Sequence, residues 1–283
     1  MAAGHGRGEA RVPVPSPMKK WLGVGLTLTA LLAACAASWL SPHDPLRTDF
    51  PQSLQPPGAA GHLLGTDQLG RDLLARVLYG ARLAMFIGVC TVLVTAVAGG
   101  LLGLVAGFTE RWPSTVLMRI VDVQLSFPFI LLAMTINAIV GLGLRNIIIS
   151  LSAAGWVVYA RVVRGEVLSV KQRDFVQAAA ALGTSRARIL FRHILPNVAP
   201  SIIIVASLQF SQFIVAEAAI SFLGFGVQPP TPAWGNMLSE SRDYLYVAWW
   251  LAAFPGAALA LTALGVNLVG DWLRDVLDPK LRV

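Results

Sequence analysis

The chain has 283 residues, of which 55% are hydrophobic and only 13% are charged, and its mean hydropathy is +0.66. Soluble domains carry about 25% charged residues, so this composition excludes an ordinary soluble protein. The formal net charge is +7, from 22 Lys and Arg against 15 Asp and Glu. Because the basic residues lie between apolar runs, they favour the cytoplasmic loops of a membrane protein, and we expect no nucleic-acid partner.

Six apolar segments are candidates for membrane-spanning helices, because about 20 apolar residues cross a bilayer. The fourth is short, and Arg161 and Arg164 would extend it, since long basic side chains reach back to the headgroups. We therefore predict an all-α polytopic membrane protein with six transmembrane helices. The segments are 21–40, 83–108, 116–140, 146–160, 198–222 and 247–269.

The placement of Lys and Arg predicts the orientation. Residues 1–18 form a Pro-rich leader with basic residues, followed by a transmembrane domain over 19–283. The loop 161–196 carries seven Lys and Arg against two acidic residues. Basic loops stay in the cytoplasm, so we place the leader, this loop and both chain ends there. Residues 41–82 then form a loop on the outer side, which we name the outer loop.

The first apolar segment has an alternative interpretation as a lipoprotein signal peptide, because an apolar stretch after Lys19 and Lys20 leads to Cys35. Cleavage there would leave five spans. The second cysteine, Cys90, lies within the next apolar segment, so the cysteines predict neither a disulfide nor a paired metal site. The histidines are also scattered without ligand spacing, and we predict no metal site; they are His5, His43, His62 and His193.

The outer loop contains an amphipathic helical pattern that starts near residue 69. We expect Thr66 or Asp67 to cap this helix and Asp72 to form an ion pair with Arg76. Two interpretations stay open. The helix lies on the membrane surface, or it is a docking surface for an extracytoplasmic partner.

Two spans contain residues that shape helices. In the second span Gly99, Gly103 and Gly107 recur every four residues, which lets a neighbouring helix approach closely. In the third span Pro128 removes one helix hydrogen bond and should bend the helix, either as a structural kink or as a hinge.

Two carboxylates lie within predicted spans. Glu217 falls near the outer end of the fifth span, and we favour a packing or gate-lining role over a proton relay, because isolated charges are costly in lipid. Asp122 lies near the cytoplasmic end of the third span, where we expect it to pair with Arg119 or with the basic loop.

The basic loop contains two short predicted helices. Residues 174–182 are strongly helix-forming, and Gly183 ends this helix. Thr184 or Ser185 can cap a second helix over 186–194. The alternative is a basic amphipathic segment resting on anionic headgroups, which would explain the arginines but not the glycine elbow.

The same loop resembles the EAA loop of bacterial ABC importer permeases. The similarity is carried by Gln177-Ala178-Ala179, by Gly183 and by Leu195-Pro196, although Gln177 stands where Glu is usual and His193 where Ile is usual. Residues 191–197, together with 64–72 and 221–237, resemble the peptide and nickel subgroup of that family. The likeness extends from about Trp21 to the end of the chain.

The resemblance implies a permease subunit of type I ABC importer architecture in the bacterial inner membrane. It would pair with a homologous permease, two cytoplasmic ATPase subunits that bind ATP with Mg, and an extracytoplasmic substrate-binding protein. This chain would hold no cofactor and no catalytic site. The binding protein would dock through Arg71, Asp72 and Trp234. Residues 166–197 would form the loop that couples to the ATPase, with the contacts made by Gln177, Ala178, Ala179, Gly183, Thr184, Ser185, Leu195 and Pro196.

The resemblance also implies the substrate class, which is di- and oligopeptides, with nickel or a peptide-like compound as the alternative. A secondary transporter driven by an ion gradient is the competing class. It should show repeated halves or several intramembrane carboxylates, and we find neither in the sequence. The sequence also has no HExxH, GxSxG or phosphate-binding loop motif, which disfavours a membrane hydrolase.

Overall fold

The computed structural model describes residues 17–109 and 112–277, so almost all of the predicted leader 1–18 lies outside the described residues. The described chain is helical and has no strand. The elements are α1 (Pro17–Cys35), α2 (Ala37–Leu40), η1 (Phe50–Gln52), η2 (Ala59–Gly61), α3 (Leu73–Thr109), α4 (Trp112–Leu125), α5 (Phe129–Val140), α6 (Leu144–Lys171), α7 (Asp174–Ala181), α8 (Arg186–Arg188), η3 (Ile189–Ile194, a π turn), α9 (Leu195–Phe222), α10 (Trp234–Glu240), η4 (Ser241–Tyr244) and α11 (Trp250–Leu277).

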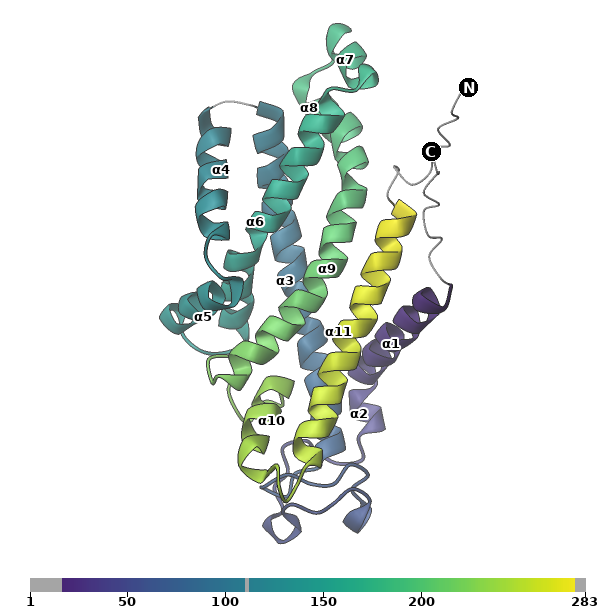
Figure 1. Ribbon diagram of the computed structural model, residues 1–283, viewed down its shortest axis with the longest axis vertical. Helices are drawn as coiled ribbons and strands as arrows, with labels where there is room; N and C mark the ends of the chain where they lie inside the picture. The colour runs from purple at the N-terminus through teal and green to yellow at the C-terminus, as the bar shows by residue number, and fades with distance from the viewer. Residues whose placement is uncertain (1–16, 110–111, 278–283) are drawn as a thin grey trace, which may run out of the picture.

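The long helices correspond to the predicted spans. Within the described residues, 5 continuous helical stretches are long and apolar enough to cross a membrane, and α4 with α5 makes a sixth if the bent pair is one span. The long helices run along the long axis of the molecule (Figure 1), with α7 and α8 at one end and the outer loop and α10 at the other. The prediction of an all-α polytopic membrane protein is confirmed.

The third span is broken rather than gently kinked. The axes of α4 and α5 differ by 97°, and α5 lies across the long axis while α4 runs along it (Figure 1). Pro128 stands directly before the first residue of α5 with φ −58°. Because proline has no N–H and its ring clashes with the preceding turn, the helix of α4 cannot continue through it.

The predicted surface helix of the outer loop is wrong as a separate element. It is the first part of α3, which has 37 residues and is therefore about 55 Å long. The cap is also different. Asp72 caps α3, since its Oδ2 accepts a hydrogen bond from the backbone N–H of Ala75 at 2.7 Å. Arg76 forms its ion pair with Asp67 instead of Asp72, because the loop folds back over the start of α3.

The glycines of the second span allow α3 to pack closely on α6, as predicted. A Cβ atom on Gly99 would lie 2.2 Å from the carbonyl oxygen of Trp156, and one on Gly103 would lie 2.6 Å from that of Ala160. Neither distance is possible for real atoms, so the close approach of the two backbones requires glycine.

The basic loop is shorter than predicted at both ends. Helix α6 does not stop near residue 160 but runs to Lys171. The second short helix does not end at residue 194, because α8 continues through the π turn η3 into α9. Pro196 has no N–H to donate to the carbonyl of Arg192. The wider π turn before Pro196 accommodates this loss, and the helix continues.

Candidate functional site

Helix α7 ends in a sharp elbow, which we define as residues 174–194. The N–H of Gly183 donates to the carbonyl of Ala180 at 3.0 Å, and the N–H of Thr184 donates to that of Ala179 at 3.1 Å. This pair of hydrogen bonds is the Schellman motif, which needs a left-handed residue after the helix. Gly183 supplies it with φ +77°, so the predicted glycine elbow is confirmed.

Beneath the elbow, apolar side chains anchor it to the long helices. Val176 of α7 is 3% exposed and Ile194 is fully buried. Both belong to one apolar cluster that joins the elbow to α3, α6 and α9, and its buried members are Leu104, Val163, Val167, Val170, Val176, Ile189, Ile194 and Val198. The elbow therefore has a fixed position relative to the spans.

The exposed surface of the elbow carries three large apolar side chains among its basic and polar ones. Leu182 is 86% exposed, Phe191 is 58% exposed and Phe175 is 43% exposed. Large apolar side chains that are exposed to this degree make the elbow a candidate contact surface. These three residues are missing from our predicted site, because sequence alone does not show which side of so short a helix stays uncovered.

The structure brings most of the predicted coupling residues to this tip. Gln177 and Ala178 are exposed and Ala179 is partly exposed, all on α7. Ser185 occupies the predicted cap position of α8, but its side chain makes no capping hydrogen bond. Leu195 is partly buried and Pro196 is exposed; both start α9.

At the opposite end, a buried polar cluster ties the outer loop to α10. Asp67 Oδ2 accepts from Arg71 Nε at 2.6 Å and also from Arg76 Nη1. Glu240 of α10 accepts from both arginines at 3.1 Å. Asp67, Arg71 and Arg76 are at most 5% exposed. We call Asp67, Arg71, Arg76 and Glu240 the polar cluster.

The three predicted docking residues are buried, so their side chains do not form an outer surface. Arg71 is 5% exposed, Asp72 is 3% exposed and Trp234 is 2% exposed. Trp234 Nε1 donates to the carbonyl of Val77 at 3.0 Å, which fastens α10 to α3. Trp234 therefore cannot present its ring to a docking protein, because α10 packs against α9 and α11.

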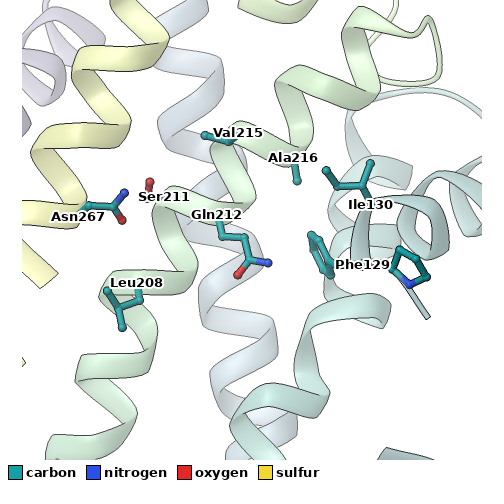
Figure 2. Close-up of a pocket in the computed structure, with 9 residues that line it drawn as sticks. Phe129, Ile130, Leu208, Ser211, Gln212, Val215, Ala216 and Asn267 are labelled. Carbon is teal, nitrogen blue, oxygen red and sulfur yellow. The ribbon is translucent and has the colours of Figure 1, made fainter. Parts of the chain in front are cut away.

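Figure 2 shows a cavity between α5, α9 and α11 with a volume of about 480 Å³. Gln212 projects from α9 into the space beside Phe129, and Asn267 projects from α11 towards Ser211 (Figure 2). Pro128 also lines this cavity, so the break in the third span forms one of its walls.

The two intramembrane carboxylates have specific partners. Glu217 is 2% exposed and accepts a hydrogen bond from Ser221 Oγ at 2.6 Å, one turn further along α9. Glu217 is thus buried inside the helix bundle, and it is not among the residues that line the cavity of Figure 2. Of the two partners expected for Asp122, the basic loop is the one observed, since Asp122 pairs with Arg161 and not with Arg119. Arg161 belongs to the extended α6, and α4 packs beside α6.

Comparisons with known proteins agree with this architecture. The family described as "Binding-protein-dependent transport system inner membrane component" matches residues 99–283. A di/tripeptide transport system permease protein of Pseudomonas aeruginosa is 43% identical, over 95% of this chain and 94% of the relative. A dipeptide transport system permease protein of Alkalihalophilus pseudofirmus is 41% identical, over 92% and 86%. A glutathione transport system permease protein of Pectobacterium atrosepticum is 41% identical, over 94% and 89%.

Proposed function

Because this chain belongs to the family of binding-protein-dependent transport system inner membrane components, we propose that it is the permease subunit through which an ABC importer carries short peptides into a bacterial cell. It forms the pathway together with a homologous permease. Two cytoplasmic ATPase subunits drive the cycle, and an extracytoplasmic binding protein delivers the substrate.

The exposed apolar tip of the elbow is the observation that carries this proposal. Leu182 is 86% exposed beside a glycine that holds a left-handed turn. Leaving such a side chain in water costs about 1.5–3 kcal/mol relative to burial, and an ATPase surface would bury it. The buried apolar cluster below the elbow would transmit the partner's movement to α6 and α9.

The energy source lies outside this chain in the proposal. The sequence has no phosphate-binding loop, so ATP with Mg²⁺ would be bound by the two ATPase subunits. The positive-inside rule supports a cytoplasmic position for the elbow, because basic residues are concentrated at this end. Both chain ends would lie on the same side.

The cavity between α5, α9 and α11 supports a pathway on this face. Gln212 is exposed within the apolar helix α9. Polar side chains inside the bilayer face protein or water rather than lipid. We therefore place the homologous permease opposite this face, with Gln212 at the pathway between the two subunits.

The outer loop is the proposed contact for the binding protein. Its buried polar cluster fixes the backbone, while Leu63 is 68% exposed and Phe50 is 65% exposed. In this proposal Arg71, Asp72 and Trp234 hold the docking surface in shape, and the exposed side chains make the contact.

We infer the substrate class from the relatives, which are named as permeases for dipeptides, tripeptides or glutathione. Uptake of a radiolabelled dipeptide by cells that express the importer, compared with cells lacking this chain, tests the substrate. Uptake of labelled nickel ions but not of dipeptide would replace the peptide assignment with the nickel alternative.

A pair of matched variants tests the coupling role. Leu182→Glu at the elbow should remove the ATPase subunits from the purified importer, because a charge would be buried at the contact. Leu63→Glu makes the same change at the opposite end, where the side chain is also exposed. It should keep the ATPase subunits. Equal retention of ATPase subunits by both variants would refute the proposed coupling surface.

A further inference from the structure

The outer loop brings two histidines to the carboxylate that caps α3. One ligand atom each from His43, His62 and Asp72 lie within 4.8 Å of one another. The sequence predicts no metal site here, because the three residues are far apart along the chain and follow no metal-binding motif. The fold of the outer loop creates the cluster.

The carboxylate of Asp72 has a fixed orientation. Its Oδ2 accepts from the N–H of Ala75 at 2.7 Å, and the side chain is 3% exposed. Its Oδ1 therefore faces the two imidazoles, 2.7 Å from His62 Nδ1 and 3.7 Å from His43 Nδ1. A carboxylate held in this way is oriented before any ligand binds.

The ring of His62 is also oriented by a hydrogen bond from its second nitrogen. His62 Nε2 lies 2.9 Å from Gln52 Oε1. With the Gln52 amide in this orientation, its oxygen accepts from Nε2, so in the neutral ring Nδ1 directs its lone pair towards Asp72. Two acceptors 2.7 Å apart require a cation between them, which is either a proton on Nδ1 or a metal ion.

His43 completes a three-sided arrangement. Its Nδ1 is buried and has no hydrogen-bond partner within the described residues, although 39% of the side chain is exposed. Its ring lies against that of His62, with the centroids 4.6 Å apart. A buried imidazole nitrogen that faces a carboxylate without bonding to it is an unused ligand atom.

We propose that His43, His62 and Asp72 bind a divalent transition-metal ion of the Zn²⁺ type. Ligand atoms about 2.1 Å from a tetrahedral ion lie about 3.4 Å apart, and the observed separations of 2.7 and 3.7 Å bracket this value. Imidazole ligands select Zn²⁺ and its neighbours over Mg²⁺ or Ca²⁺. Gln52 supplies the outer hydrogen bond that orients a ligating histidine.

The pocket around the three ligands gives a metal ion access to the site, and its charge favours a cation. The site opens into a pocket of about 190 Å³, which leaves room for water as the fourth ligand. Besides the site, the ionisable groups that line this pocket are Asp44, Asp49 and Arg47. With neutral histidines, three carboxylates face one guanidinium, so the pocket carries a net negative charge.

The ion would clamp the outer loop. It would join residue 43, just after α2, and residue 62 to the first turn of α3. Because metal binding to this chain needs neither ATPase subunits nor substrate, the site can be tested independently of the proposed transport function.

The test uses the full-length chain in lipid nanodiscs, purified with a tag that contains no histidine. After dialysis against Zn²⁺, we expect one Zn²⁺ per chain by elemental analysis, and no binding of Mg²⁺. Bound Co²⁺ should show the intense visible absorption of a tetrahedral site. His43→Gln removes one ligand without touching the α3 cap and should abolish stoichiometric binding. Gln52→Ala should weaken binding about 10- to 100-fold.

His193→Gln is the matched control, because it makes the same change in the elbow at the other end of the molecule. It should bind Zn²⁺ like the wild type. Wild-type chain that takes up less than one tenth of an equivalent of Zn²⁺ would overturn the proposal and leave His62 and Asp72 as a proton-bearing pair. Equal binding by wild type and His43→Gln would overturn it as well.

Discussion

The elbow glycine offers the sharpest test of the coupling role, because substitution there strains the backbone without a steric clash. Gly183 has φ +77°, and a Cβ atom built on it meets nothing within 4 Å. Placing alanine in this left-handed conformation costs about 1–2 kcal/mol. Valine is β-branched, and its cost should approach about 3 kcal/mol.

These energies set the expected loss of ATPase binding. Each 1.4 kcal/mol is a factor of ten in an equilibrium constant. If the strained elbow relaxes to a shape that does not bind, the apparent affinity for the ATPase subunits falls by up to about 5- to 30-fold for Gly183→Ala and up to about 150-fold for Gly183→Val. Asparagine tolerates the left-handed region, so Gly183→Asn should restore most of the affinity.

The assay measures the amount of ATPase subunit that co-purifies with each variant, and peptide uptake by the same cells. Gly165→Ala is the matched control, because Gly165 is also exposed and also has nothing within 4 Å of an added Cβ, but lies within α6 without a positive φ. It should bind ATPase normally. The reasoning is refuted if the Gly183 variants match Gly165→Ala in both measurements.

Three further experiments test the fold. Gly103→Leu should lower the free energy of unfolding of the purified chain by about 1–3 kcal/mol, because its Cβ would lie 2.6 Å from a backbone oxygen of α6. Gly100→Ala should cause no such loss, because the nearest atom to its Cβ lies at 3.8 Å, and equal losses in the two variants would contradict the close packing of α3 on α6. Asp67→Asn should cost about 3–5 kcal/mol in the free energy of unfolding, because it leaves two buried arginines short of a partner; a change below about 1 kcal/mol would mean that the polar cluster adds little. In a background without native cysteines, Leu182→Cys should react with a membrane-impermeant maleimide only from the cytoplasm, and Pro57→Cys should react only from outside. The reverse labelling pattern would show that the chain has the opposite orientation in the membrane.

Some features are determined by the sequence because they depend on neighbouring residues alone. The length of an apolar run decides whether a helix can cross a membrane, so the spans are predictable to within a few turns. Pro128 and Gly183 act on their own backbone, which is why the break before α5 and the elbow after α7 occur where the sequence predicts them.

Helix ends are predicted less well, because the free backbone N–H and C=O groups at a helix end can find hydrogen-bond partners in more than one way. Pro196 should end a helix by its local chemistry, but the π turn before it lets α8 continue into α9. Likewise, Thr66, Asp67 and Asp72 all precede α3 and could each cap it, but the fold selects Asp72 as the cap while Asp67 bonds to arginines.

Contacts between distant residues are decided only by the tertiary structure. Arg76 and Glu240 are separated by 164 positions, and nothing in either local sequence indicates the other. The same holds for the burial of Trp234 against α3 and for the meeting of His43 with His62. Hydropathy and residue spacing indicate the local structure of a segment. The partner of a buried charge or imidazole is determined only when the helices pack and exclude water.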